Sequence, residues 1–222
     1  MSDFTDYLRR FNSEERFYLL GYILGNPGLR PASSSLEQIS GVLGLRIPED
    51  AFAAMDFHLD WLYASLHMAF AGGKSGVIAN QGANIAGQQE DIDYLIAFEQ
   101  GGTHSVVLID AKAKSAWSAS QLESKARRLS KIFGHDGKHW RKLDPYFILL
   151  SPRRPVNLDV SKWPSWMCPN GRFAWIELPI PGDLLKVTRC DGNGKPHQSG
   201  ASGKSTGADS CLVIGLTSRQ TV

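Results

Sequence analysis

The sequence predicts an α/β protein of the mixed α+β kind, in which helices flank a central mixed sheet and a helical region precedes it. Two apolar runs around Gly101-Gly102 have the pattern of a β-hairpin. Helical signals come before this hairpin, and a helix followed by another apolar strand comes after it. The order helix, strand, hairpin, helix, strand is typical of a mixed sheet covered by helices on both faces.

We expect three regions: a helical N-terminal region over 1–46, a core over 47–189, and a flexible Gly/Ser-rich loop with a C-terminal strand over 190–222. The chain has 222 residues, of which 42% are hydrophobic and 21% charged, as in an ordinary soluble globular protein. No apolar run approaches a membrane span, and the first residues lack the basic start and apolar core of a secretory signal. Three widely spaced cysteines show neither zinc spacing nor a disulfide framework. We therefore expect a cytoplasmic protein without membrane contacts.

Helical signals come first along the chain. Asn12 or Ser13 caps a helix over 14–24, and Ser34 opens a short helix toward Leu43. A long helix is expected to begin at Pro48-Glu49-Asp50 and to end near Gly72-Gly73, because its apolar residues recur three and four positions apart. These apolar residues are Phe52, Met55, Leu59, Leu62, Leu66 and Ala69.

Strands dominate the rest of the predicted core. A short strand over 75–79 and a polar connection over 80–89 precede the hairpin, and a helix over 118–133 follows it. The remaining strands are expected over 146–150, 173–178, 184–189 and 211–216.

The hairpin joins the apolar runs Ile92–Phe98 and Val106–Ile109. In antiparallel pairing about its tight turn, Gln100 faces Thr103. Both alternating faces of the two runs are apolar, so we expect the hairpin to be covered on both sides.

Two carboxylates meet at one end of this hairpin. The same register places Asp93 opposite Asp110, with Cβ atoms roughly 5 Å apart. Lys112 lies two residues further and projects from the same face. Buried acids must be protonated, paired or bound to a cation, and aspartate oxygens suit a hard ion such as Mg²⁺. A salt-bridged cluster at the mouth of the sheet is the alternative.

The order of these residues resembles the PD-(D/E)xK nuclease superfamily, which has the restriction-endonuclease-like fold. Asp93 on one strand is followed by Asp110-Ala111-Lys112 at the end of the next. Gln121 and Lys125 then fit a Gln-x-x-x-Lys element on the following helix. The resemblance covers roughly 50–150, and the chain departs from the motif where an isoleucine replaces the proline.

This resemblance implies a metal-dependent nuclease that hydrolyses phosphodiester bonds, with a DNA endonuclease as the first expectation. It implies that Asp93, Asp110 and the carbonyl of Ala111 bind Mg²⁺, for which Mn²⁺ can substitute. Lys112 and Gln121 would complete the catalytic set. Gln121 has a simpler alternative role, because Ser118 and Gln121 also form a capping box.

Members of this superfamily often have one more acid on a helix before the first strand. Asp60 is our first choice for that metal ligand, with Asp56 and Glu49 as alternatives. A solvated helix face explains each of these residues equally well.

A basic stretch follows the proposed site. Residues 110–154 contain 11 Lys/Arg against 4 Asp/Glu, whereas the rest of the chain has 13 against 18. Such a stretch suits a phosphodiester backbone, although a solvated basic helix is the alternative. The expected nucleic-acid-binding residues are Lys114, Lys125, Arg128, Lys138, Trp140 and Arg141. Trp140 has its own alternative, as an anchor that holds its loop in the core.

Three functions remain open. The first is the DNA endonuclease, for which a restriction, defence or mobile-element role fits, and for which a homodimer would most easily cut both strands. The second is a catalytically inactive module with the same fold that binds nucleic acid or a protein partner. The third is an RNA-cleaving toxin, and we expect DNA rather than RNA as the partner.

Overall fold

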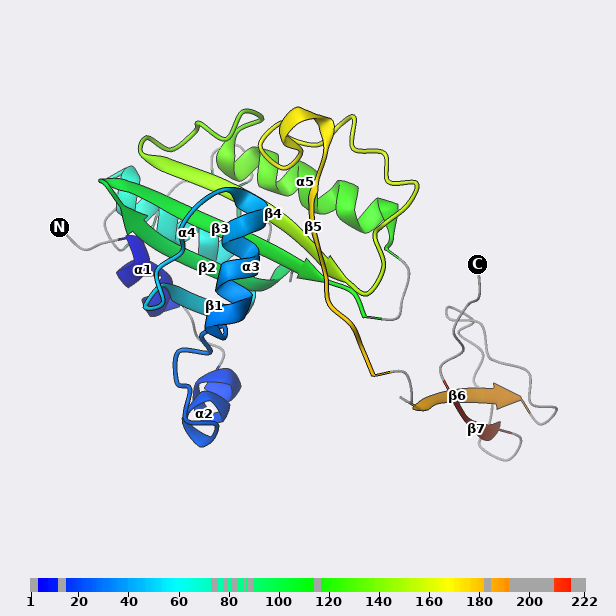
Figure 1. Cartoon of the computed structure of the whole chain (residues 1–222). Helices are drawn as coiled ribbons and strands as arrows, with labels where there is room; N and C mark the ends of the chain where they lie inside the picture. Colours follow the sequence, from blue (N-terminus) through cyan, green and yellow to red (C-terminus); the bar gives the residue numbers. More distant parts are fainter. Residues whose placement is uncertain are drawn as a thin grey trace. The chain divides into compact units, whose positions relative to one another are not determined.

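A five-stranded mixed sheet organises the larger part of the chain (Figure 1). In spatial order its strands are β1 (Phe52–His58), β2 (Asp91–Gln100), β3 (Thr103–Ala111), β4 (Leu143–Ser151) and β5 (Ala174–Glu177). The first three strands are antiparallel, and β4 and β5 run parallel to β3. The mixed sheet flanked by helices is therefore confirmed.

This computed structural model describes residues 4–11, 15–72, 76–77, 80, 84–85, 87, 90–113, 117–181, 185–191 and 210–216. Most of the strand predicted over 75–79 and much of the connection over 80–89 lie outside the described residues, and the two described residues of that strand, Gly76 and Val77, are not in a strand. Within the described ranges, every helix is too short or too polar to cross a bilayer.

The β2–β3 hairpin has the predicted register. Gln100 faces Thr103 across the turn, and Leu95 faces Leu108. Gly101 and Gly102 both have positive φ, at 62° and 77°, which is the combination that a two-residue type I′ turn requires. This turn fixes which residues of β2 and β3 face each other.

The long helix predicted from Pro48 to Gly72 is wrong in its first half. Residues 52–58 form β1, and the helix α4 (Leu59–Phe70) begins only afterwards. The first apolar residues have helical spacing, but they pair with β2 instead; Met55, for example, lies opposite Tyr94. A short apolar run fits a buried strand as well as a helix, so spacing alone does not distinguish the two.

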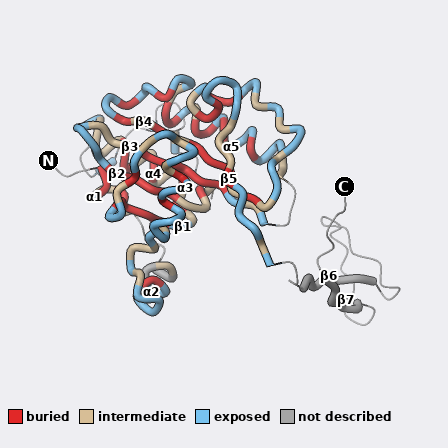
Figure 2. Tube along the Cα trace, viewed as in Figure 1, coloured by how far each residue is buried: buried red, intermediate tan, exposed pale blue. Residues whose placement is uncertain are grey.

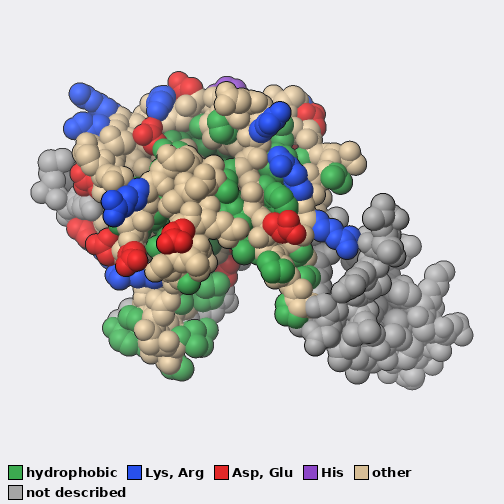
Figure 3. All heavy atoms as spheres, in the orientation of Figure 1, with side chains coloured by type: hydrophobic (Ala, Val, Ile, Leu, Met, Phe, Trp, Pro, Cys, Tyr) green, Lys and Arg blue, Asp and Glu red, His purple; other side chains and the backbone are tan. Residues whose placement is uncertain are grey.

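The N-terminal helical region is present as α1 (Phe4–Phe11), α2 (Glu15–Ile23) and α3 (Ser33–Leu43). This region does not form a core of its own, because α1 packs its apolar face into the main core. Helix α2 exposes its apolar side chains instead, as Figure 3 shows, with Ile23 81% exposed. The predicted cap residues Asn12 and Ser13 lie outside the described residues.

The sheet is covered on both faces, as the hairpin pattern predicted (Figure 2). Helices α1, α4 and α5 (Ala119–Phe133) pack on one face, against strand residues such as Leu95 and Leu108. Helix α3 packs on the other, against Ile96 and Val107. Side chains from β2 and β3 are therefore buried on both sides of the sheet.

The chain divides into two compact units, 1–178 and 179–222. In the second unit, β6 (Leu185–Asp191) pairs antiparallel with β7 (Ser210–Leu216), so these two predicted strands are present. The division falls before β6, whereas the sequence placed the end of the core at 189. The loop between these strands lies outside the described residues.

Replacing Leu108 by alanine should lower the free energy of unfolding by about 2–5 kcal/mol, because Leu108 is fully buried in the main core. Urea denaturation followed by circular dichroism measures this change. Val156, which is 77% exposed, provides the control, and its alanine variant should stay within about 0.5 kcal/mol of wild type. Equal stability of the two variants would contradict the core described above.

Candidate active site at the end of the hairpin

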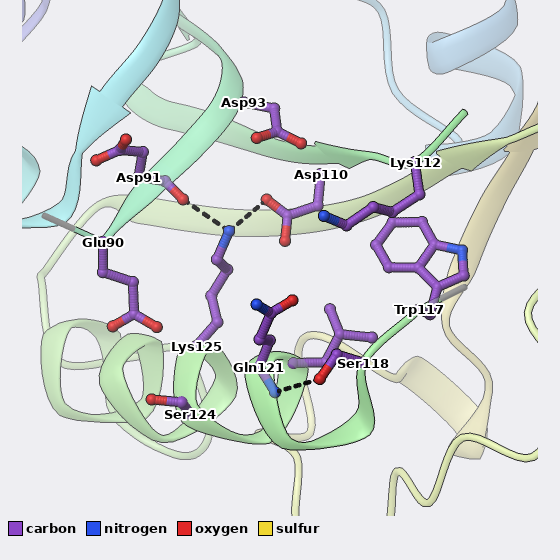
Figure 4. Close-up of a pocket in the computed structure, with 11 residues that line it drawn as sticks. Glu90, Asp91, Asp93, Asp110, Lys112, Trp117, Ser118, Gln121, Ser124 and Lys125 are labelled. Atoms are coloured by element: carbon purple, nitrogen blue, oxygen red, sulfur yellow. Dashed lines mark hydrogen bonds and ion pairs between the residues drawn. The ribbon is translucent and has the colours of Figure 1, made fainter. Parts of the chain in front are cut away.

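An open cavity of about 430 Å³ lies where β2 and β3 meet α5 (Figure 4). Its lining combines four acidic residues and two lysines with several polar and apolar side chains. The lining residues are Glu90, Asp91, Asp93, Asp110, Lys112, Trp117, Ser118, Gln121, Leu122, Ser124 and Lys125. Sequence analysis named Asp93, Asp110, Lys112, Gln121 and Lys125, and all five lie together here.

The hairpin register brings the two aspartates together. Ladder pairing ends with Tyr94 opposite Ile109, and one further step along the same register places Asp93 opposite Asp110. Their positions continue the rows of Leu95 and Leu108, so they lie on the face of the sheet that α5 covers.

Helix α5 supplies the opposite wall of the cavity. The Ser118 side chain caps its first turn by accepting the N–H of Gln121 at 3.3 Å. Gln121 and Lys125 are four residues apart, and both side chains point from the helix toward the aspartates. Ser118 therefore caps the helix through the backbone N–H of Gln121, while the Gln121 side chain lines the cavity.

Asp110 is the most buried acid of the site, with a side chain only 7% exposed. The Lys125 ammonium lies 2.6 Å from its Oδ1 atom and also 2.6 Å from the backbone carbonyl oxygen of Asp91. Burial raises the pKa of the Asp110 carboxyl, and Asp93 adds to this effect, whereas Lys125 and Lys112 partly offset it. A carboxylate at this position therefore needs a cation beside it.

Asp93 and Asp91 make different contacts. The Asp93 Oδ2 atom accepts the N–H of Ala111 at 2.6 Å, which ties the side chain to the end of β3. Asp91 instead forms an ion pair with His58 when the imidazole is protonated, at 2.9 Å. Ala111, predicted as a metal ligand, contributes this N–H and is not among the cavity-lining residues.

Asp60, predicted as a metal ligand, lies outside the cavity. Its carboxylate pairs with the guanidinium of Arg128 and accepts the N–H of Gly87, and it does not line the cavity. Of the two alternatives, Glu49 accepts a hydrogen bond from Ser33, far along the chain from the hairpin. Asp56 lies on β1 between Met55 and Phe57, the partners of Tyr94 and Ile92, so the register places it beside Asp93.

Asp56 has a left-handed backbone, with φ of 45°, and the regular β1–β2 pairing is interrupted at its position. Strained backbone of this kind is concentrated at functional sites. Asp56 does not line the cavity, however. Asp93 and Asp110 are the two acids that face each other inside it.

Two of the predicted nucleic-acid-binding residues are buried, which corrects the prediction. Arg128 is 7% exposed and holds Asp60. Trp140 is also 7% exposed and donates its indole N–H to the Ile132 carbonyl, so it anchors its loop in the core. Neither side chain can stack on a base or reach a phosphate without leaving the core.

The other predicted contact residues have different surroundings. Lys138 and Arg141 are exposed, and Lys138 pairs with Asp144 at 2.8 Å. Lys125 lies inside the cavity rather than on the outer surface. Lys114 lies outside the described residues.

Sequence analysis missed Glu90, Trp117, Ser124 and the Asp91–His58 pair. Glu90 is three residues before the predicted Asp93, so its position in the chain was a usable signal. The contact of His58 with Asp91 depends on the pairing of β1 with β2, which the predicted long helix had hidden.

The donor set suits a hard divalent cation. Four carboxylates and two ammonium groups line the cavity, a formal balance of −2. Mg²⁺ needs only one or two carboxylates and otherwise keeps its waters or takes phosphate oxygens. In such a site Asp93 and Asp110 would provide these carboxylates, although the part of the chain that is described holds no group of three or more His, Cys, Asp or Glu residues arranged for a metal.

Comparisons of the chain with family models, with curated proteins and with solved structures gave no match.

Replacing Arg128 by methionine should lower the free energy of unfolding by about 3 kcal/mol, because it removes the guanidinium that balances the charge of the mostly buried Asp60 carboxylate. The Asp60→Asn, Arg128→Met double variant should recover at least half of this loss. Chemical denaturation of the single and double variants measures the coupling between the two residues. Additive losses would show that the pair does not interact in this way.

Proposed function

We propose that this protein is a divalent-metal-dependent nuclease, in the first instance a DNA endonuclease that uses Mg²⁺ or Mn²⁺. One observation carries the proposal: Asp93, Asp110 and Lys112 share a cavity with Gln121 and Lys125 of the facing helix. These are the residues on which the resemblance to the PD-(D/E)xK nucleases rests, and they come from three separate elements. The proposal depends on the position of these residues in one cavity and not on similarity to a known protein.

The charge of the cavity supports a metal. A phosphodiester is an anion, and the four carboxylates would repel it more strongly than the two ammonium groups attract it. A divalent cation held by Asp93 and Asp110 would bring the formal charge of the lining to zero. When bound, such a cation polarises the scissile phosphate and lowers the pKa of a bound water.

Each remaining side chain has a role that follows from its position. Lys112, from the same face as Asp110, would hold a non-bridging phosphate oxygen and stabilise the charge that develops there. Gln121, with both a donor and an acceptor, would orient the attacking water. The Asp93 contact to Ala111 would keep its carboxylate fixed while substrate binds.

Binding of the nucleic acid would use exposed basic residues outside the cavity, such as Lys138 and Arg141. A homodimer would supply two cavities for the two strands of DNA. Such an enzyme would act in the cytoplasm.

The Asp110–Lys125 pair favours one alternative, a catalytically inactive module that binds nucleic acid or a protein partner. An ammonium already balances the buried carboxylate, so the Asp110 charge is compensated without a metal. In that case, the protein would bind nucleic acid or its partner and cleave neither DNA nor RNA.

Replacing Asp110 by asparagine or Lys112 by methionine should reduce the cleavage rate by at least about 100-fold. The first change weakens the hold on the metal, and the second removes a positive charge that stabilises the transition state. The assay follows labelled DNA and RNA with Mg²⁺ or Mn²⁺, and EDTA should abolish cleavage. Asp159, an exposed acid outside the cavity, provides the control, and its asparagine variant should cleave at the wild-type rate. Unchanged cleavage by either cavity variant would refute this mechanism.

A further inference from the structure

The Lys125 ammonium stands where a metal ion would be expected. It contacts one carboxylate oxygen of Asp110 and the backbone carbonyl oxygen of Asp91, both at 2.6 Å. Carboxylate and carbonyl oxygens are also the ligands that hard divalent cations take. Figure 4 shows the ammonium between these two oxygens, at the centre of the acidic wall.

The other lysine of the cavity is arranged differently. Lys112 points into the same cavity, but within the described part of the chain it forms no ion pair. Lys125 is 14% exposed and comes from the helix rather than from the sheet. The two amines are thus distinct: one neutralises the buried acid, and the other faces the open part of the cavity.

A metal ion bound to the Oδ1 atom of Asp110 would take the place of the Lys125 ammonium on that atom. Mg²⁺ binds oxygen at about 2.0–2.1 Å, and two cations so close on one carboxylate would repel each other strongly. The long, flexible lysine side chain is the part that can move, because the aspartates are fixed by the register and by the Ala111 contact.

We propose that Lys125 is an internal cation that holds the Asp110 carboxylate until a divalent metal displaces it. The inference rests on the proposed function, because it assumes that the metal binds at Asp110. It makes Lys125 a positioning residue that sets the affinity for metal. Once displaced, its ammonium enters the open cavity, where it is available to a phosphate. Metal and anionic substrate would then favour each other's binding. The metal frees the Lys125 ammonium to contact a phosphate, and the phosphate balances the positive charge that the metal adds.

Metal affinity tests the proposal directly. Isothermal titration with Mn²⁺ compares the wild type with Lys125→Gln, which removes the charge but keeps an N–H donor for Asp110. We expect the variant to bind Mn²⁺ at least 10-fold more tightly, because no internal cation competes. Lys162→Gln is the matched control: Lys162 also pairs with a carboxylate, that of Glu123 on α5, but it is 74% exposed and outside the cavity. Equal or weaker binding by Lys125→Gln would overturn the proposal.

A second measurement uses the unaltered protein and so does not depend on the folding of a variant. An amine-acylating reagent, with peptide mass spectrometry, reports how accessible each lysine is with and without Mg²⁺. Acylation of Lys125 should rise several-fold on adding Mg²⁺, while acylation of Lys162 stays constant. Constant acylation of Lys125 at saturating Mg²⁺ would also overturn the proposal.

The outcomes separate this proposal from the proposed function. If Lys125→Gln binds Mn²⁺ more tightly and an added Asp110→Asn change abolishes that gain, the internal cation is established even if the wild type cleaves no nucleic acid. If the wild type cleaves with Mg²⁺ but Lys125→Gln gains no affinity, the nuclease stands and the internal cation is refuted. Absence of Mn²⁺ binding to either form would refute both.

Discussion

The register of the β2–β3 hairpin is the constraint on which the site depends. Gly101 and Gly102 adopt the two positive φ angles of a tight turn, and that turn decides which residues face each other. A slip of one residue would move one strand's side chains to the other face of the sheet and separate Asp93 from Asp110. Apolar residues on both faces do not fix this register by themselves, because Leu95 and Ile96 are buried on opposite sides and a slip would exchange one apolar face for the other.

The site itself balances burial against charge. Asp110 lies between packed strands with almost no exposure, and burial raises the pKa of its carboxyl. Lys125 offsets this by placing an ammonium on the same oxygen. A buried ion pair is weak evidence for a gain in stability, since desolvation cancels much of the attraction. The pair of Asp110 and Lys125 in an acidic cavity is therefore better explained by binding than by stability.

Local signals predicted much of this arrangement. The glycine pair predicted the hairpin, and the spacing of Leu122, Ala126 and Leu129 predicted α5. Both predictions succeed because each structure is determined by residues close together in the sequence. The errors came from long-range partners. The residues of β1 have helical spacing but pair with β2, and Asp60 lies beside Arg128, which is 68 residues away. Nothing near Asp60 in the sequence indicates this partner.

Anomalous diffraction from crystals soaked in Mn²⁺ is the most direct test of the central claim, that Asp93 and Asp110 share one divalent ion. The account predicts a single strong peak within bonding distance of both carboxylates, with the Lys125 side chain turned away from Asp110. Crystals that show no peak there at saturating Mn²⁺, and that keep Lys125 on Asp110, would contradict it.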